Sequence, residues 1–345
     1  MKNIRCISTF LVSLLILTSV GGCTSKPKTD NTKTIVIYTS VDQVYSEKIF
    51  KQFEKESGIK VKAVYDIEAQ KTVGLANKII AEKDNPQADV FWNGEILQTI
   101  RLKNAGVLQK TDILKAKDLP SSFVDKNGFW YGFGGRSRVM LVNTSLLALN
   151  KCPKTMAEIP TGTYIEKTGI AYPVFGTASN EAAALYSIWG YVKAKEYYTK
   201  LKNAGISVLD GNSVVKDYVS QKKLYMGLVD TDDALSEMIK NKDLDILFMD
   251  QGKNDMGALV IPNTVCCIKG APHPSEADAF MEFLLSASTE QKLVDDGWIN
   301  IPVHSGVKTA PELSLKKIKI MQIDFNNIYT KLAISKKDIT NIFVR

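Results

Sequence analysis

Residues 34–65 read TIVIYTSVDQVYSEKIFKQFEKESGIKVKAVY. The β-branched run at 34–38 predicts a buried strand. Apolar residues then recur at helical spacing over 44–56, where they place Ile49, Phe50 and Phe53 on one face, and a Ser-Gly pair ends this helix. Residues 59–65 alternate like a second strand. A strand, a helix and a strand joined by short loops predict a parallel sheet, so we expect an α/β fold.

The same alternation continues along the chain. We expect further strands at 88–92, 139–142, 170–172, 224–229, 258–261 and 265–268, and helices at 71–83, 95–104, 181–202, 275–286 and 316–345. The length of 345 residues suits two domains. With 45% hydrophobic and 23% charged residues, the composition excludes a disordered chain, a coiled coil and a disulfide-dense scaffold. The net charge of +7 is modest for a chain of this length, and we expect no nucleic-acid partner.

The N-terminal segment has the pattern of an export signal. A basic start precedes an apolar run over 10–20, which is too short to span a membrane. Cys23 follows two glycines, as in a bacterial lipobox, so we expect signal cleavage after residue 22 and a lipid on Cys23; the alternative is ordinary cleavage beside an incidental cysteine. Residues 23–33 are polar and read as a flexible tether. The protein is therefore expected to be lipid-anchored on the extracytoplasmic side of the cell envelope.

Motifs for catalysis are absent from the sequence. There is no phosphate-binding loop, no dinucleotide fingerprint and no nucleophile elbow. His273 and His304 have no second ligand at metal-binding spacing. Cys266 and Cys267 are adjacent on a predicted strand, so their side chains face opposite ways and read as packing residues; a disulfide with Cys152 stays open. We expect no enzyme, although a hydrolase or transferase on a two-lobe α/β fold remains the alternative from a different class.

Seven segments in order resemble the ferric-iron-binding proteins of bacterial ABC importers, within the type II solute-binding proteins. They are IVIYTSVDQ (35–43), GIKVKAVY (58–65), PQADVFWNGEI (86–96), GGRSRVMLVNT (134–144), FGTASNEAA (175–183), GLVDTDDA (227–234) and GALVIPNTVCCIKGAPHPSEADAFMEFLLS (257–286). Each segment alone is a weak signal. Their order, behind a lipobox, points to the solute-binding fold.

The resemblance implies two α/β lobes joined by two crossing strands, with a ligand cleft and a hinge between them. The first lobe is then 34–137 plus 261–308, and the second is 138–260 plus 309–345. The crossings fall near 136–139 and 258–262. Hinge closure around the ligand would deliver it to an ABC permease and its ATPase. A monomer is expected.

The loops that the resemblance assigns to the ligand follow strand ends, which is where open α/β sheets bind ligands. The candidate ligand-binding residues are Thr39, Ser40, Asp42, Trp92, Asn93, Glu95, Arg136, Arg138, Thr177, Ser179, Asp230, Asp232 and Asp233. The loops at 39–42 and 176–180 open helices, so they suit an oxyanion or simply cap those helices. Trp92 lies at the cleft mouth or in the core. Arg136 suits a carboxylate or phosphate beside a metal, or a structural ion pair.

The residues that hold the metal in the resembled family are changed here. Its two adjacent tyrosines correspond to Asp232 and Asp233, and a histidine of its first loop corresponds to Asp42. The pair at 197–198 cannot replace those tyrosines, because neighbours on a helix diverge by about 100°. Since hard cations take oxygen ligands, we expect Asp42, Glu95, Asp232 and Asp233 as metal ligands.

Two kinds of cargo fit this set of residues. The first is ferric iron or a ferric complex, with Fe(III) held beside a synergistic anion. The second is a phosphorylated or phosphonate solute, whose anion meets Arg136 and the Thr177–Ser179 loop while the carboxylates accept hydrogen bonds from its hydroxyl or ammonium groups. A helix start that merely faces solvent is the remaining interpretation of the aspartates. The sequence thus predicts an extracytoplasmic solute receptor.

Overall fold

The computed structural model describes residues 33–66 and 73–344. The expected export signal, Cys23 and all of the tether except Lys33 lie outside the described residues. Among the described residues, no helix is long and apolar enough to cross a membrane.

The described strands join in the order β2-β1-β3-β10-β5-β8-β6-β7, with β4 on β10 and β9 on β5. Their bounds are β1 (Thr34–Thr39), β2 (Lys60–Tyr65), β3 (Val90–Asn93), β4 (Leu108–Gln109), β5 (Tyr131–Asn143), β6 (Thr168–Ala171), β7 (Ser207–Leu209), β8 (Met226–Asp230), β9 (Leu244–Leu247) and β10 (Val260–Ile268). Pairing of β1 with β2 and β3 is parallel, as is pairing of β6 with β7 and β8. The α/β class is therefore confirmed and the predicted parallel pairing holds for these strands, whereas β10 pairs antiparallel with β3 and β5, and β5 pairs antiparallel with β8.

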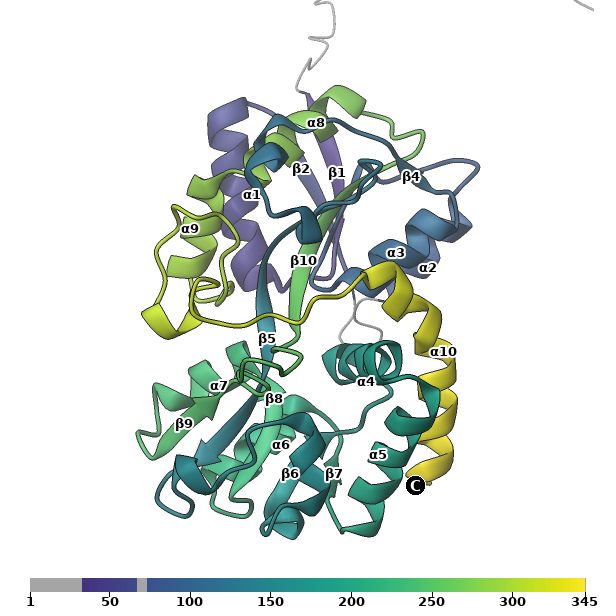
Figure 1. Ribbon diagram of the computed structural model, residues 1–345. Helices are drawn as coiled ribbons and strands as arrows, with labels where there is room; N and C mark the ends of the chain where they lie inside the picture. The colour runs from purple at the N-terminus through teal and green to yellow at the C-terminus, as the bar shows by residue number, and fades with distance from the viewer. Residues whose placement is uncertain (1–32, 67–72, 345) are drawn as a thin grey trace, which may run out of the picture. The chain divides into compact units, whose positions relative to one another are not determined.

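Strand β5 connects two groups of strands (Figure 1). Up to Ser137 it pairs with β10, and from Arg138 onward it pairs with β8. We call the elements around β1, β2, β3 and β10 the first lobe and those around β6, β7 and β8 the second lobe. The two-lobe fold class is confirmed, and the residue boundaries of the lobes stay a prediction.

Strand β10 corrects the expectation of two separate strands at 258–261 and 265–268. It runs unbroken over 260–268, with a register shift between Pro262 and Asn263. Proline has no N–H to donate to a ladder, and a bulge accommodates it so that pairing continues on both sides.

Helices cover both faces of the first lobe's sheet (Figure 1). One face packs against α1 (Gln43–Ser57), α8 (Pro274–Leu284) and α9 (Ala287–Asp295). The other packs against α2 (Gly74–Ala81) and α3 (Ile96–Asn104). Cys267 belongs to the first of these cores and Cys266 to the second, which confirms their opposite orientation. Both are free and buried, as is Cys152, so the disulfide left open by the sequence does not form.

The second lobe has the same layered construction. Its faces carry α4 (Gly176–Trp189) with α5 (Tyr191–Asn203), and α6 (Asn212–Ser220) with α7 (Thr231–Met238). The single helix expected at 181–202 is wrong, because Gly190, at φ 80° and ψ 168°, separates α4 from α5 in a conformation essentially restricted to glycine. Helix α4 also begins earlier than expected, within the predicted loop. Short 3₁₀ helices lie in connections: η2 (Leu114–Asp118), η3 (Ser121–Phe123), η4 (Leu149–Lys151), η5 (Met156–Thr161), η6 (Ile165–Lys167) and η7 (Pro311–Leu313).

Helix α10 (Phe325–Ile342) packs against α3, α4 and α5, and so contacts both lobes. Its start at residue 325 corrects the longer helix expected over 316–345: Asp324 caps it by accepting the N–H of Asn326. Phe325 and Ile328 share a core with α3, while Ile339 joins the core of the second lobe. The two lobes are thus joined by the apolar contacts of α10 as well as by β5.

Candidate functional site

A cavity of about 920 Å³ is lined by residues of both lobes. The first lobe contributes mainly from the turn after β1, the turn after β3 and the segment after α9. The second contributes from the starts of α4 and α6 and from β8 and α7. The polar lining residues are Ser40, Asp42, Tyr45, Glu95, Arg136, Thr177, Asn212, Ser213, Asp230, Asp232, Asp233, Ser236, Asp296, Asn300 and Thr309.

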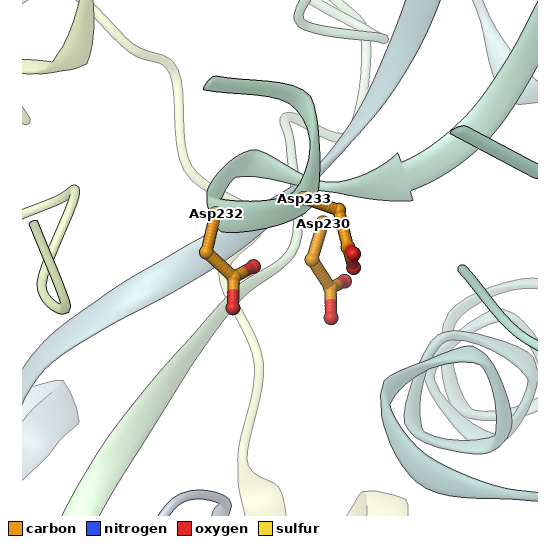
Figure 2. Close-up of side chains that lie close together, drawn as sticks. All are labelled: Asp230, Asp232 and Asp233. Carbon is orange, nitrogen blue, oxygen red and sulfur yellow. The ribbon is translucent and has the colours of Figure 1, made fainter. Parts of the chain in front are cut away.

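Three aspartates meet where β8 ends and α7 begins. Asp230 is the last residue of β8, and Asp232 and Asp233 lie in the first turn of α7. Figure 2 shows their carboxylates extending to the same side of this turn. One oxygen of each lies within 4.8 Å of the others. The helix N-terminus favours negative charge there, and we call these three residues the aspartate trio.

Asp230 is fixed by a buried network. Arg138 donates to its Oδ1 at 2.8 Å, and Thr177 donates to its Oδ2 at 2.6 Å. Asn212 also donates to Oδ2, at 3.1 Å. Burial opposes the charge on Arg138, but Glu181 and Asp230 outweigh that effect and raise the pKa of the guanidinium. The network therefore positions Asp230 rigidly at the cavity wall.

Asp232 has one engaged oxygen and one unengaged oxygen. Its Oδ2 accepts from Arg136 Nη1 at 3.0 Å. Its Oδ1 is covered by protein and has no hydrogen-bond partner among the described residues. Burial raises the pKa of the Asp232 carboxyl, and the charge of Arg136 opposes that rise. This oxygen is therefore a buried acceptor whose hydrogen-bonding capacity is not used by the described residues.

The carboxyl of Asp233 is strongly perturbed by its surroundings. Burial, followed by the charges of Asp232 and Asp230, raises its pKa to about 7. Lys216 and Arg136 oppose this rise only partly. At neutral pH the trio therefore holds a shared excess of negative charge, part of it neutralised by a proton that a bound cation can displace.

Glu95 lies at the cavity but does not join the trio. Its carboxylate caps α3 by accepting from the N–H groups of Leu97 at 2.6 Å and Gln98 at 2.9 Å. It also accepts from Asn180 at 3.2 Å. The expected metal set of Asp42, Glu95, Asp232 and Asp233 is thus not what the structure gathers. The close set is Asp230, Asp232 and Asp233, because a strand end and a helix start bring these three together.

The structure divides the thirteen candidate ligand-binding residues into two groups. Eight line the cavity: Ser40, Asp42, Glu95, Arg136, Thr177, Asp230, Asp232 and Asp233. Five do not: Thr39, Trp92, Asn93, Arg138 and Ser179.

Local packing explains why those five are turned away. The Trp92 indole is fully buried and meets Trp298 edge to face at 5.7 Å between ring centroids. Trp92 therefore lies in the core and not at the cleft mouth. Thr39 accepts the N–H of Val41, Asn93 receives the hydroxyl hydrogen of Ser40, and Ser179 donates to the Gly176 carbonyl. Arg138 donates to Asp230 within the buried network.

Sequence reasoning missed the apolar part of the cavity. Tyr45 and Trp298 lie side by side there, with ring centroids 6.4 Å apart. Ile239 lines the cavity with 74% of its surface exposed. Nothing local in the sequence marks Trp298, which follows α9, whereas Tyr45 lies on the first turn of α1, beside a loop already singled out. Asn212 was also missed, although it starts a helix after a strand.

The two-lobe fold and the polar cavity between the lobes define a binding protein of the solute-receptor type. The chain belongs to the family described as bacterial extracellular solute-binding protein, whose model matches residues 48–319. The family resemblance inferred from the seven segments is thereby confirmed.

Relatives and solved structures agree with this assignment. The "Major ferric iron-binding protein" of Neisseria meningitidis serogroup B is 24% identical over 268 residues, which is 75% of this chain and 78% of that protein. The "Putative 2-aminoethylphosphonate-binding periplasmic protein" of Salmonella typhimurium is 22% identical over 311 residues, with 87% and 88% covered. Iron-bound HitA from Pseudomonas aeruginosa has a TM-score of 0.79 at 23% identity, covering 89% of this chain and 99% of HitA. At these identities the structural likeness establishes the fold.

Proposed function

We propose that this chain is the extracytoplasmic receptor of an ABC importer and that its cargo is ferric iron, bound as the ion or as a complex. The observation that carries the proposal is the aspartate trio in the cavity between the lobes. Carboxylate oxygens are ligands that hard cations prefer. The ferric-iron names of the Neisseria relative and of HitA support the same cargo.

Binding would change the internal ion pair of the site. Asp232 is held by Arg136 in the structure described here. A ferric ion at the trio would compete for Asp232, which would free the planar fork of Arg136 for the anion that accompanies the iron. The trio offers oxygen ligands in place of the two tyrosines of the resembled family.

The rest of the proposed organisation follows from the sequence. Residues 1–22 direct export, Cys23 carries the lipid anchor, and 23–33 tether a monomeric receptor to the membrane. The lobes, 34–137 plus 261–308 and 138–260 plus 309–345, close by a hinge where β5 changes partner. The closed form delivers its cargo to the permease and its ATPase, with neither catalysis nor nucleic acid involved.

A phosphonate solute is the second candidate cargo. Arg136 lines the cavity, and Thr177 lies on the first turn of α4, so both are placed to meet an anion. The aspartate trio would then hold an ammonium group. The Salmonella relative named for 2-aminoethylphosphonate binding favours this alternative.

The two candidates separate in a thermal-shift and calorimetry experiment on protein that starts at residue 24, in metal-free buffer. Ferric nitrilotriacetate and 2-aminoethylphosphonate are the probes. A ligand at 100 times its Kd adds about 2.7 kcal/mol of stability, which is readily measured. We expect a shift with the ferric probe that a strong chelator reverses. A shift with the phosphonate alone would transfer the proposal to the second candidate.

Paired variants link that shift to the trio. Asp232→Asn removes a trio carboxylate and should strongly reduce the ferric shift. Asp296→Asn is the matched control, because Asp296 also lines the cavity but is paired with Lys48 at 3.1 Å and lies outside the trio. Equal loss in both variants would mean that general cavity charge, and not the trio, holds the ion.

A further inference from the structure

We propose that the cargo enters the cavity as an organic complex of zero or positive net charge, whose apolar part packs against Tyr45, Trp298 and Ile239. This inference rests on the proposed iron-receptor function and specifies the form in which the iron is bound. Three features of the cavity carry it: the donor atoms that the trio supplies, the charge of the lining, and an apolar wall.

The trio cannot complete the coordination of a ferric ion. Each aspartate offers one oxygen to the common position, whereas octahedral coordination by oxygen takes six donors. Tyr45 is the one tyrosine among the described residues that line the cavity, and it lies on α1 of the first lobe, next to Trp298. The remaining donors therefore come with the iron. A cavity of about 920 Å³ leaves room for the chelator that supplies them.

The charge of the lining restricts that chelator. Among the described residues, six carboxylates line the cavity: Asp42, Glu95, Asp230, Asp232, Asp233 and Asp296. Arg136 is the single cationic side chain among the described lining residues, and it is already paired with Asp232. Arg138 and Lys48 pair with Asp230 and Asp296 from outside the lining, so the lining carboxylates still outnumber these three cations. A complex with excess carboxylates, such as ferric citrate, would add negative charge to this lining and be repelled. A neutral or positive complex would be attracted.

Helix α7 combines the charged and apolar parts of the site. Asp232, Leu235 and Ile239 follow one another at i, i+3 and i+7, so they lie along one face of the helix and its C-terminal end. All three line the cavity. The face therefore runs from carboxylate to apolar surface, and a ligand with a metal-binding head and an apolar body matches that order.

The first lobe supplies the opposite apolar surface. Tyr45 and Trp298 stand together at the cavity, and Val294 of α9 also lines it. Ile239, on the second lobe, keeps 74% of its surface exposed. An exposed apolar residue facing a lined cavity is a candidate for ligand contact. Contact with these residues explains why an otherwise acidic site retains aromatic and aliphatic lining.

Two ferric complexes that differ only in their apolar part test the inference. The probes are iron with two acetohydroxamates and iron with two benzohydroxamates, which share the same chelating groups and the same positive net charge; ferric citrate is the anionic comparison. Calorimetry on the wild-type protein should give about tenfold tighter binding of the benzohydroxamate complex, because burial of one added ring removes apolar surface from water. Ferric citrate should bind more weakly than either.

A matched pair of surface variants assigns that difference to the cavity. Ile239→Ser should weaken binding of the benzohydroxamate complex far more than binding of the acetohydroxamate complex, and so remove most of the preference. Val192→Ser is the control, because Val192 is 75% exposed and lies outside the cavity, and it should retain the full preference.

The outcomes separate this inference from the function on which it rests. Equal binding of the two hydroxamate complexes, or tightest binding of ferric citrate, would overturn the inference and leave an iron receptor. Failure of every ferric form to bind, together with binding of 2-aminoethylphosphonate, would overturn the iron receptor itself.

Discussion

Asp233 should make the affinity for ferric iron depend on pH, and Asp233→Asn should remove that dependence. The carboxyl has a pKa raised to about 7, chiefly by burial and then by Asp232 and Asp230. A bound cation needs the ionised form, so protonation competes with binding. With a pKa of about 7, the ionised fraction falls from about one half at pH 7 to about one hundredth at pH 5, which lowers the apparent affinity about 50-fold.

The assay is a competition titration with nitrilotriacetate at pH 5, 6 and 7. Calorimetry in buffers of different ionisation enthalpy adds the proton count: about half a proton should be released at pH 7 for each iron bound, as a pKa of about 7 requires. Asp233→Asn should flatten the profile. Asp296→Asn, which changes another cavity carboxylate, should keep the wild-type slope.

Stability of the ligand-free protein gives an independent readout of the same carboxyl. The folded pKa of Asp233 lies above the ordinary aspartate value of 3.8. The folded state therefore binds the proton more tightly than the unfolded state. The stability that this protonation contributes is fully present below the unfolded pKa and is lost as the pH rises through about 7. Asp233→Asn should raise the Tm at pH 8 and change it little at pH 4. A variant with the wild-type pH profile in both assays would refute the assignment of this titration to Asp233.

Three further substitutions test other parts of the site. Arg138→Ala leaves two buried carboxylates without their cation and should lower the free energy of unfolding by about 3–5 kcal/mol, measured with denaturant. Arg136→Ala breaks a partly exposed pair and should lower it by about 1 kcal/mol or less. Similar losses in the two variants would mean that both arginines are structural. Glu95→Ala removes the side-chain cap of α3 and should lower stability by about 1 kcal/mol, or about 2 °C in Tm, with ferric affinity unchanged; lost affinity would make Glu95 a ligand. Gly134→Ala should destabilise the protein strongly, since its φ is 41° and the new Cβ would lie 2.3 Å from Ile299; a wild-type Tm would show that β5 yields at this point.

Much of the fold could be predicted because its signals are local. The β-branched run of β1, the amphipathic spacing of α1 and the glycine after it each determine an element within a few residues. Gly190 was harder to interpret, because a glycine between two helical patterns is compatible with one long helix or with two. The two strands expected at 258–261 and 265–268 form one strand for a similar reason: a bulge beside Pro262 keeps β10 in the sheet, and only pairing with β5 on both sides reveals it.

The candidate site was predictable only where its residues are close in sequence. Asp230, Asp232 and Asp233 stand in one segment, so the sequence pointed to them together. The apolar wall includes Tyr45 and Trp298, which lie far apart in the chain and meet only when the first lobe folds. Glu95 shows a second limit of prediction from sequence. A carboxylate beside a helix start can cap that helix or bind a cation, and the sequence does not distinguish these roles.

The most direct test of the central claim is the amount of iron that stays on the protein. Wild-type protein and the Asp232→Asn/Asp233→Asn double variant would be loaded with ferric nitrilotriacetate, desalted and assayed for iron. We expect stoichiometric iron on the wild type and almost none on the double variant, with both folded by their Tm. Equal iron on the two proteins, or none on the wild type, would contradict an iron receptor built on the aspartate trio.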